Sequence, residues 1–194
     1  MGETMAVQAI IFDLYGVLAM NGWQAFKAAH FSDRENVWHH IYLLSRQVDA
    51  GLAGYDDLVR FTAEQSGESE ATVRYQMEHS EPNIELLEYI AAELKGRYKL
   101  SILSNSRSDD ALNKLFTPEQ RALFDDTLLS HHLGLFKPDP RMYLAAAERL
   151  GVAPEACLFV DDREHHAAGA QQAGMRPLIY TNLTKLEHDL AALL

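Results

Sequence analysis

The sequence predicts an α/β fold, a doubly wound parallel sheet with a small α-helical cap inserted after the first strand. Three observations lead to this prediction. Short apolar runs each end at a polar residue, which is typical of strands buried on both faces of a parallel sheet. Segments with apolar residues at helical spacing alternate with these runs. Residues 20–80 interrupt the alternation, because they contain helical patterns and no convincing strand.

The apolar runs are the expected strands of the sheet. The clearest runs are residues 9–12, 100–103 and 157–160, which end at Asp13, Ser104 and Asp161. Weaker patterns of the same kind lie at 127–129 and 177–180. Buried strands that alternate with helices are typical of parallel pairing, with each helix as the crossover between two strands.

Capping residues mark the helices of the expected core. Apolar residues at helical spacing occupy 84–94, and Gly96 follows them, where a helix end favours glycine. Asp139 and Pro140 are typical of an N-cap and a first helical residue, and Gly151 is placed to end that helix.

Two more helices are expected near the C-terminus. Small residues predict a helix over 167–173 that ends at Gly174. Thr184 and Glu187 have the spacing of a capping box, which predicts the start of the last helix.

The insertion divides the expected fold into two parts. Its helical patterns lie at 38–48, 58–61 and 72–76. We therefore expect an α/β core made of residues 1–19 and 81–194, and a helical cap made of residues 20–80.

Composition limits the classes of function. The 194 residues carry a net charge of -11, which disfavours binding to nucleic acid. Cys157 is the single cysteine, so an intramolecular disulfide is excluded and a cysteine-based zinc site is disfavoured. No apolar run approaches the roughly 20 residues that span a bilayer, and the N-terminus lacks the pattern of a signal peptide. We expect a cytoplasmic protein without a membrane partner, and the sequence leaves its oligomeric state open.

Polar residues follow the predicted strands at one edge of the sheet. Ligands of parallel sheets bind beyond the carboxyl ends of the strands. The residues expected there are Asp13, Ser104, Asn105, Asp161 and Asp162, with Lys137 in reach from a loop. Each of them alone is typical of a turn or a helix cap, and only their joint placement favours a site.

The predicted cluster of carboxylates requires a cation. Two carboxylates about 4 Å apart repel by about 4 kcal/mol at an effective dielectric constant near 20. Oxygen ligands of this kind favour Mg²⁺ over zinc.

Four segments, in order along nearly the whole chain, resemble the motifs of the haloacid dehalogenase superfamily, whose members are mostly phosphatases with a Rossmann-like core. The segments are 12–18 (Phe-Asp-Leu-Tyr-Gly-Val-Leu), 103–105 (Leu-Ser-Asn), 136–140 (Phe-Lys-Pro-Asp-Pro) and 159–162 (Phe-Val-Asp-Asp). The helical insertion after the first segment resembles the branch of the superfamily that has an α-helical cap.

The resemblance implies a reaction and the residues that perform it. Asp13 would be the nucleophile, which forms an aspartyl-phosphate that water then hydrolyses. The catalytic group implied is Asp13, Tyr15, Ser104 and Lys137, and the phosphate or substrate group is Gly16, Ser104, Asn105 and Lys137. The substrate would be a small phosphorylated metabolite.

The resemblance also implies a Mg²⁺ site. Its ligands would be Asp13, the backbone carbonyl of Tyr15, and Asp161 or Asp162. Positioning and electrostatic stabilisation by such groups are most of what phosphoryl transfer requires.

Tyr15 departs from the phosphatase pattern. Two residues after the nucleophile these enzymes usually carry a second aspartate as general acid and base. A phenol with a pKa near 10 is a weak substitute, so protonation of the leaving group is in question.

Two other functions stay open because of Tyr15. The 2-haloacid dehalogenases carry Asp-x-Tyr-Gly-Thr at the first motif and use no metal, but their fourth motif is Ser-Ser-Asn-x-Trp-Asp, unlike Asp161 and Asp162 here. A binding or regulatory protein with this fold and weakened catalysis is the other alternative. Phosphatase activity is favoured over both.

Adjacent histidines are not expected to bind a metal. The pairs are His39-His40, His131-His132 and His165-His166. Neighbours in a helix point about 100° apart, so a pair does not form a chelate. His166 is singled out because it follows Asp162 closely, at a position where related phosphatases often have asparagine.

Overall fold

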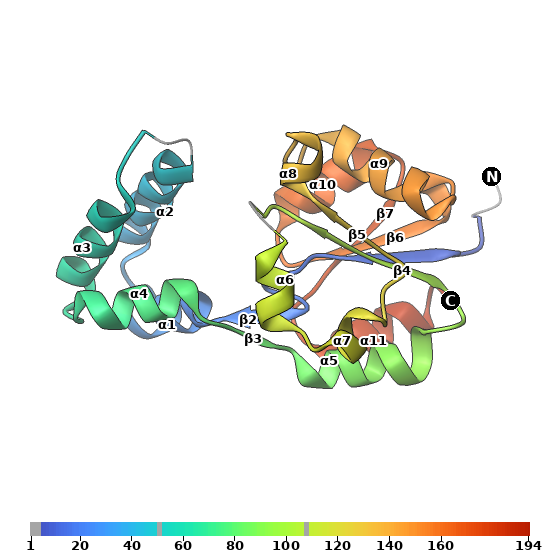
Figure 1. The fold of residues 1–194 in the computed structure, drawn as a ribbon, viewed down its shortest axis with the longest axis horizontal. Coiled ribbons are helices and arrows are strands. Elements are labelled where there is room, and N and C mark those ends of the chain that lie inside the picture. Colours follow the sequence, from blue (N-terminus) through green and yellow to red (C-terminus); the bar gives the residue numbers. More distant parts are fainter. Residues whose placement is uncertain (1–4, 50–51, 107–108) are drawn as a thin grey trace. The chain divides into compact units, whose positions relative to one another are not determined.

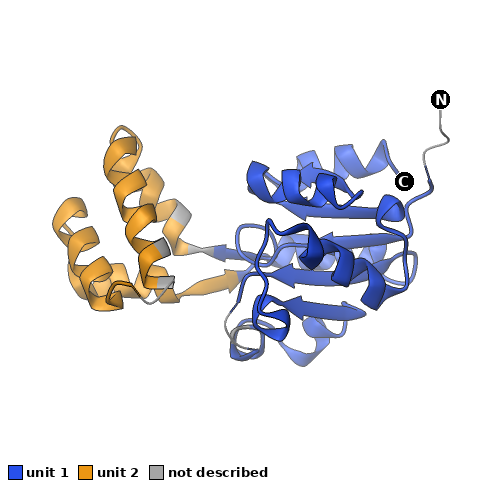
Figure 2. Cartoon of the chain, turned by 90° about the horizontal axis from the view of Figure 1, so that it is seen from above, with its two compact units in different colours: residues 1–20, 82–194 blue, residues 21–81 orange. Residues whose placement is uncertain are grey.

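The structure is a computed structural model that describes residues 5–49, 52–106 and 109–194. The chain divides into two compact units (Figure 2). Unit 1 consists of residues 1–20 and 82–194, and unit 2 consists of residues 21–81.

Unit 1 is built on a five-stranded parallel sheet in the order β5-β4-β1-β6-β7 (Figure 1). The strands are β1 (Ala9–Phe12), β4 (Lys99–Ser104), β5 (Asp126–Leu129), β6 (Cys157–Asp161) and β7 (Arg176–Ile179). The three clearest apolar runs form the centre of the sheet, and the two weaker patterns form its edges. The prediction of a doubly wound α/β fold is confirmed.

Helices cover both faces of this sheet (Figure 1). On one face lie α5 (Ile84–Tyr89) with its π-helical continuation Ile90–Leu94, α6 (Asp110–Leu115), α7 (Pro118–Arg121) and α11 (Leu183–Ala191). On the other lie α8 (Ser130–Leu133), α9 (Pro140–Leu150) and α10 (Glu164–Gln172), and a 3₁₀ turn (Pro154–Ala156) precedes β6. Successive β1 side chains alternate between the two cores: Ile10 and Phe12 join the first, and Ile11 the second.

The helix ends of unit 1 test the predicted caps. The Asp139 side chain accepts a hydrogen bond from the Arg141 N–H, Pro140 is the first residue of α9, and Gly151 ends it in the left-handed conformation, as expected. At the last helix the capping box was predicted wrongly. Asn182 is the N-cap, because its extended backbone lets its side chain accept from the N–H of Lys185.

Unit 2 contains four helices among its described residues. They are α1 (Gly22–Phe31), α2 (Glu35–Asp49), α3 (Tyr55–Ser66) and α4 (Glu70–Glu78). The helix α1 was missed from the sequence, although Trp23, Phe26 and Phe31 have the spacing of one helix face. They pack into a core of their own with α2, α3 and α4. Neither this unit nor unit 1 shows a described helix with the length and apolar character needed to cross a membrane.

Two short strands stand where the chain enters and leaves unit 2. The strands β2 (Ala19–Asn21) and β3 (Ser80–Pro82) pair as a two-stranded sheet. The expectation of no strand between residues 20 and 80 was therefore wrong. A strand of three residues is too short to produce an alternating pattern in the sequence.

Candidate active site

Asp13 lies at the carboxyl end of β1, in the middle of the sheet. After β1 the chain first forms β4 and β5 on one side and then β6 and β7 on the other side. The carboxyl end of β1 is therefore a topological switch point, the place where open α/β sheets bind ligands. The Asp13 N–H donates to the Val160 carbonyl at 2.8 Å, and Oδ1 of Asp13 accepts from the Leu14 N–H at 2.7 Å. These bonds hold a buried carboxylate at the carboxyl end of the central strand.

Lys137 brings a buried ammonium to this carboxylate. Its Nζ is 2.7 Å from Oδ1 of Asp13 and 2.8 Å from Oδ2 of Asp161, and its side chain is 1% exposed. The same Nζ lies 5.2 Å from the centre of the Phe159 ring, on β6. The structure thus places three of the sequence-predicted residues in direct contact.

Asn105 fixes the backbone of Lys137. The Lys137 N–H donates to Oδ1 of Asn105 at 2.8 Å, and Nδ2 of Asn105 donates to the Lys137 carbonyl at 3.1 Å. On the other side of the loop Gly169 of α10 approaches Pro138, whose carbonyl oxygen is 2.4 Å from where a Cβ of residue 169 would lie. The Asn105 amide is therefore engaged in positioning Lys137.

Several hydrogen bonds hold the carboxylate of Asp161. Besides Lys137 it accepts from the Arg163 N–H at 2.9 Å, and Nδ1 of His166 lies 3.1 Å from Oδ1 and 3.0 Å from Oδ2. Burial alone would raise the pKa of Asp161, but the His166 hydrogen bond and the Lys137 charge hold this pKa well below its usual range. Asp161 stays ionised and anchors Lys137.

His166 is a site residue whose role the sequence did not predict. It is buried beside Asp161, and its carbonyl accepts from the Tyr143 hydroxyl at 2.8 Å. Burial lowers the pKa of His166, against the opposing effect of the Asp161 hydrogen bond, so the ring contributes no extra positive charge at neutral pH. One ligand atom from each of Asp13, Asp161 and His166 lies within 4.8 Å of the others.

The electrostatics of Asp13 favour a further cation. Burial raises the pKa of Asp13, the Lys137 ammonium opposes this effect, and the charge of Asp161 raises the pKa further. The single ammonium of Lys137 contacts two buried carboxylates, Asp13 and Asp161. Asp162, the next residue along the chain, adds a third carboxylate. Carboxylate oxygens in this number are a donor set that fits Mg²⁺.

Gly16 gives the Asp162 carboxylate room beside the first motif. A Cβ on Gly16 would lie 2.6 Å from both Cγ and Oδ2 of Asp162. The φ of Gly16 is +95°, a conformation that favours glycine, and its N–H closes a tight turn onto the Ala19 carbonyl at 2.8 Å. The turn therefore brings the backbone next to Tyr15 close to the fourth motif.

Tyr15 is half-buried in this turn. Burial, followed by the negative charge of Asp13, raises the pKa of the Tyr15 phenol above its ordinary value. The phenol is therefore an even weaker proton donor and a scarcer base at neutral pH than a tyrosine in water.

Ser104 offers a hydroxyl with no hydrogen-bond partner among the described residues. It ends β4, next to β1, and the residue is 1% exposed. A buried hydroxyl without a partner is uncommon in proteins. An oxygen atom of a bound ligand would satisfy it.

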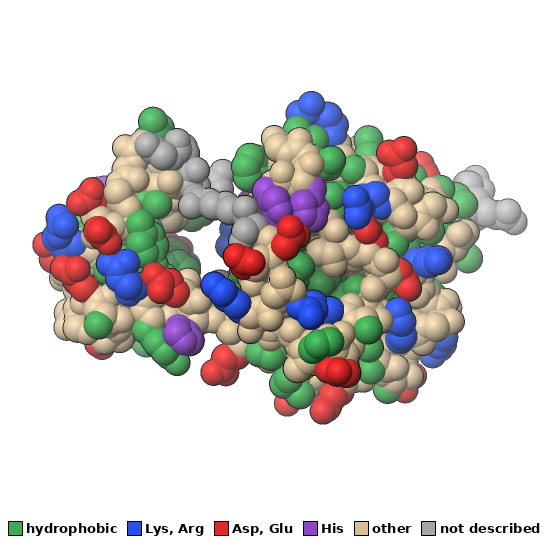
Figure 3. Space-filling view, viewed as in Figure 1, with side chains coloured by type: hydrophobic (Ala, Val, Ile, Leu, Met, Phe, Trp, Pro, Cys, Tyr) green, Lys and Arg blue, Asp and Glu red, His purple; other side chains and the backbone are tan. Residues whose placement is uncertain are grey.

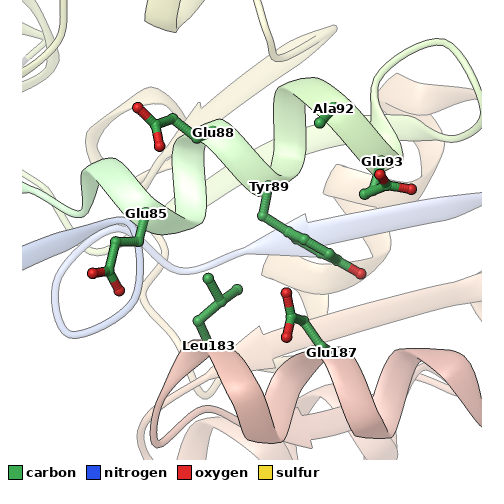
Figure 4. Close-up of a pocket in the computed structure, with 7 residues that line it drawn as sticks. All are labelled: Glu85, Glu88, Tyr89, Ala92, Glu93, Leu183 and Glu187. Atoms are coloured by element: carbon green, nitrogen blue, oxygen red, sulfur yellow. The ribbon is translucent and has the colours of Figure 1, made fainter.

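A surface pocket on another part of unit 1 does not suit phosphate. The pocket, of about 610 Å³, lies between α5 and α11 (Figure 4). It is lined by Glu85, Glu88, Tyr89, Ala92, Glu93, Leu183 and Glu187. Four carboxylates repel a phosphorylated ligand, so the switch point of the sheet remains the candidate site.

Comparison with protein families gives one match across most of the chain. A model of the haloacid dehalogenase-like hydrolases matches residues 7–174. Phosphatase MT3486 of Mycobacterium tuberculosis is 27% identical over 199 residues, which cover 89% of this chain and 86% of that protein.

Shorter matches include proteins of two activities. Flavin mononucleotide hydrolase 1 of Arabidopsis thaliana is 40% identical over 67 residues, or 34% of this chain and 27% of that protein. The (S)-2-haloacid dehalogenase 4A of Burkholderia cepacia is 34% identical over 77 residues, or 40% of this chain and 33% of that protein.

Solved structures share the fold. A HAD family enzyme of Bacteroides thetaiotaomicron, in complex with magnesium and inorganic phosphate, has a TM-score of 0.59 at 22% identity, with 93% of this chain and 99% of that chain covered. A dehalogenase with an intermediate complex has a TM-score of 0.67 at 22% identity, with 91% and 85% covered. At this identity the likeness shows a common architecture.

Proposed function

The chain belongs to the haloacid dehalogenase-like hydrolases, and we propose that it is a Mg²⁺-dependent phosphohydrolase that acts on a small phosphorylated metabolite through an aspartyl-phosphate on Asp13. One observation carries the proposal. At the switch point of the sheet Asp13 contacts the buried ammonium of Lys137, and the end of the neighbouring strand offers the Ser104 hydroxyl, which has no hydrogen-bond partner in the part of the chain that the structure describes.

The side chains suit the two steps of such a reaction. An oxygen of Asp13 attacks phosphorus, the bond to the leaving oxygen breaks, and water then hydrolyses the acyl phosphate to return the carboxylate and phosphate. Lys137 reduces the repulsion between Asp13 and the phosphoryl group. The Ser104 hydroxyl donates to a phosphoryl oxygen.

The proposed Mg²⁺ ligands are Asp13, the backbone carbonyl of Tyr15, and Asp162. Asp161 is less suitable, because both of its oxygens already accept hydrogen bonds from Lys137, His166 and the Arg163 N–H. Bound Mg²⁺ would supply positive charge to the phosphoryl oxygens and favour the ionised form of Asp13.

The roles of the remaining parts follow from this proposal. Asn105 positions Lys137 through its amide, and Gly16 accommodates the Asp162 carboxylate. Residues 20–80 are proposed as the helical cap, and the cytoplasm as the location of the protein.

A metal-free 2-haloacid dehalogenase is the second candidate, and Tyr15 is the observation that favours it. Against it, the fourth motif supplies Asp161 and Asp162, and additional carboxylates disfavour the departure of a halide ion. A catalytically weakened binding protein would show neither reaction.

Metal dependence and product identity separate these functions. With a panel of phosphorylated metabolites and activated phosphate esters, we expect release of phosphate that requires Mg²⁺ and stops with EDTA. Mg²⁺ is also expected to raise the melting temperature, because it binds the folded state. If Mg²⁺ and EDTA change neither melting nor activity, the metal assignment fails. Halide release from a 2-haloacid without metal would establish the dehalogenase function.

Substitution of Tyr15 tests how the leaving group is protonated. We expect wild type to hydrolyse aryl phosphates better than alkyl phosphates, because a phenolate leaves without a proton. Tyr15→Asp is expected to raise turnover of alkyl phosphates by about 10²-fold or more, the usual contribution of general acid catalysis, with a much smaller effect on aryl phosphates.

Tyr15→Asn is the matched control, because it has the shape of the aspartate variant without the acid. The backbone carbonyl is the same in all three proteins, so the Mg²⁺ requirement is expected to persist. Equal gains on alkyl and aryl substrates, or efficient alkyl phosphate hydrolysis by wild type, would show that another group supplies the proton.

A further inference from the structure

Three side chains outside the candidate active site converge at the surface of unit 1. They are Asp109, which precedes α6, and His131 and His132 of α8. Nε2 of His131 is 3.3 Å from Oδ2 of Asp109, and Nε2 of His132 is 2.9 Å from Oδ1. Figure 3 shows histidine side chains gathered at α8 with acidic side chains beside them.

This convergence on one carboxylate was not apparent from the sequence. Adjacent histidines of a long helix point about 100° apart. Here α8 is a single turn of four residues, and the two carboxylate oxygens of Asp109 reach both rings. One ligand atom from each of the three residues lies within 4.8 Å of the others.

The hydrogen bonds of His131 leave a lone pair facing the carboxylate. Nδ1 of His131 lies 3.1 Å from the Ser106 carbonyl oxygen, which only accepts, so Nδ1 carries the proton of a neutral ring. In the neutral ring, Nε2 is the nitrogen with the lone pair that binds a metal, and it lies 3.3 Å from Oδ2 of Asp109.

The distances suit two bonds to one metal ion. Bonds of about 2.1 Å at angles between about 90° and 110° place two ligand atoms about 3.0–3.4 Å apart. The separation of 3.3 Å between Oδ2 of Asp109 and Nε2 of His131 lies within this range, and that of 2.9 Å between Oδ1 and Nε2 of His132 lies just below it. A histidine ligand whose other nitrogen donates to a backbone carbonyl, as His131 does to Ser106, is the usual arrangement in metal sites.

His132 adjusts one contact on coordination. In the structure its Nδ1 accepts from the Leu129 N–H at 3.3 Å, which places the ring proton on Nε2. Binding of a metal through Nε2 requires the ring proton on Nδ1, and it therefore breaks the long hydrogen bond from the Leu129 N–H. Imidazole nitrogens with a carboxylate favour Zn²⁺, Co²⁺ and Ni²⁺ over Mg²⁺.

We propose that Asp109, His131 and His132 form a second metal site, which binds a divalent ion of the zinc class and is separate from the Mg²⁺ site at Asp13. The ion would link the segments that follow β4 and β5. The proposal does not depend on the reaction proposed for Asp13.

Zn²⁺ titration by calorimetry in excess Mg²⁺ tests the site, with the visible absorption of bound Co²⁺ as a second measurement. We expect wild type to bind Zn²⁺ and to show Co²⁺ bands that histidine coordination produces. His132→Ala and Asp109→Asn are each expected to weaken binding by about tenfold or more, since loss of an outer partner alone costs about 10–100-fold.

Two controls assign the signal to these residues. His188→Ala removes an exposed histidine that also lies beside an aspartate, Asp189, and is expected to leave binding unchanged. Asp13→Asn is expected to bind Zn²⁺ as wild type does, because Asp13 is not part of the proposed site. No Zn²⁺ binding in excess Mg²⁺, or binding that survives His132→Ala and Asp109→Asn but is lost in Asp13→Asn, would overturn the proposal and leave a pair of hydrogen-bonded histidines.

Discussion

Asp13→Asn is expected to lower phosphate release to below about a thousandth of wild type, because it removes the nucleophile while leaving its surroundings in place. The asparagine side chain has the same shape, and its Oδ1 can still accept from the Leu14 N–H. Lys137 keeps its contact with Asp161 at 2.8 Å, so the buried ammonium retains a partner. We therefore expect the variant to fold.

Steady-state kinetics with the best substrate of the phosphate panel measures this effect, and thermal melting reports on the fold. The informative result is a folded protein without turnover. Activity above about a tenth of wild type in a folded variant would remove Asp13 from the role of nucleophile, since loss of a nucleophile costs orders of magnitude more.

Lys137→Met is expected to lower both activity and stability. Its ammonium contacts two buried carboxylates, Asp13 at 2.7 Å and Asp161 at 2.8 Å. Removal of one partner from a buried ionic cluster leaves uncompensated charge, at a cost of about 3–5 kcal/mol in the free energy of unfolding. Urea denaturation without Mg²⁺ measures this loss.

A surface lysine provides the matched control. Lys95 contacts Asp125 at 3.1 Å, with both side chains 34% exposed, and Lys95→Met is expected to cost less than about 1 kcal/mol. The double variant Asp13→Asn, Lys137→Met is expected to be more stable than Lys137→Met alone, because one of the two carboxylates is then neutral. A loss at Lys137 no larger than that at Lys95 would contradict the electrostatic account of the cluster.

Much of the core fold was predictable from local pattern. Three apolar runs that end at Asp13, Ser104 and Asp161 became the central strands of the sheet. Buried strands are apolar on both faces, and this property is present in a single segment. The caps at Asp139 and Gly151 were predictable for the same reason, since they depend on neighbouring residues only.

Weak local signals explain what was missed. The strands β2 and β3 have three residues each, and they form because they pair with one another. For these strands a contact between distant segments, rather than local preference, determines the structure.

The candidate site divides in the same way. Parallel strands end at a common edge, so the sequence alone determined that Asp13, Ser104 and Asp161 would lie near one another. Only the tertiary structure decided what each side chain contacts: the amide of Asn105 is engaged by the backbone of Lys137, and His166 donates to Asp161. The physical reason is that a hydrogen bond requires two groups within about 3 Å at a suitable angle, and packing between remote segments sets both.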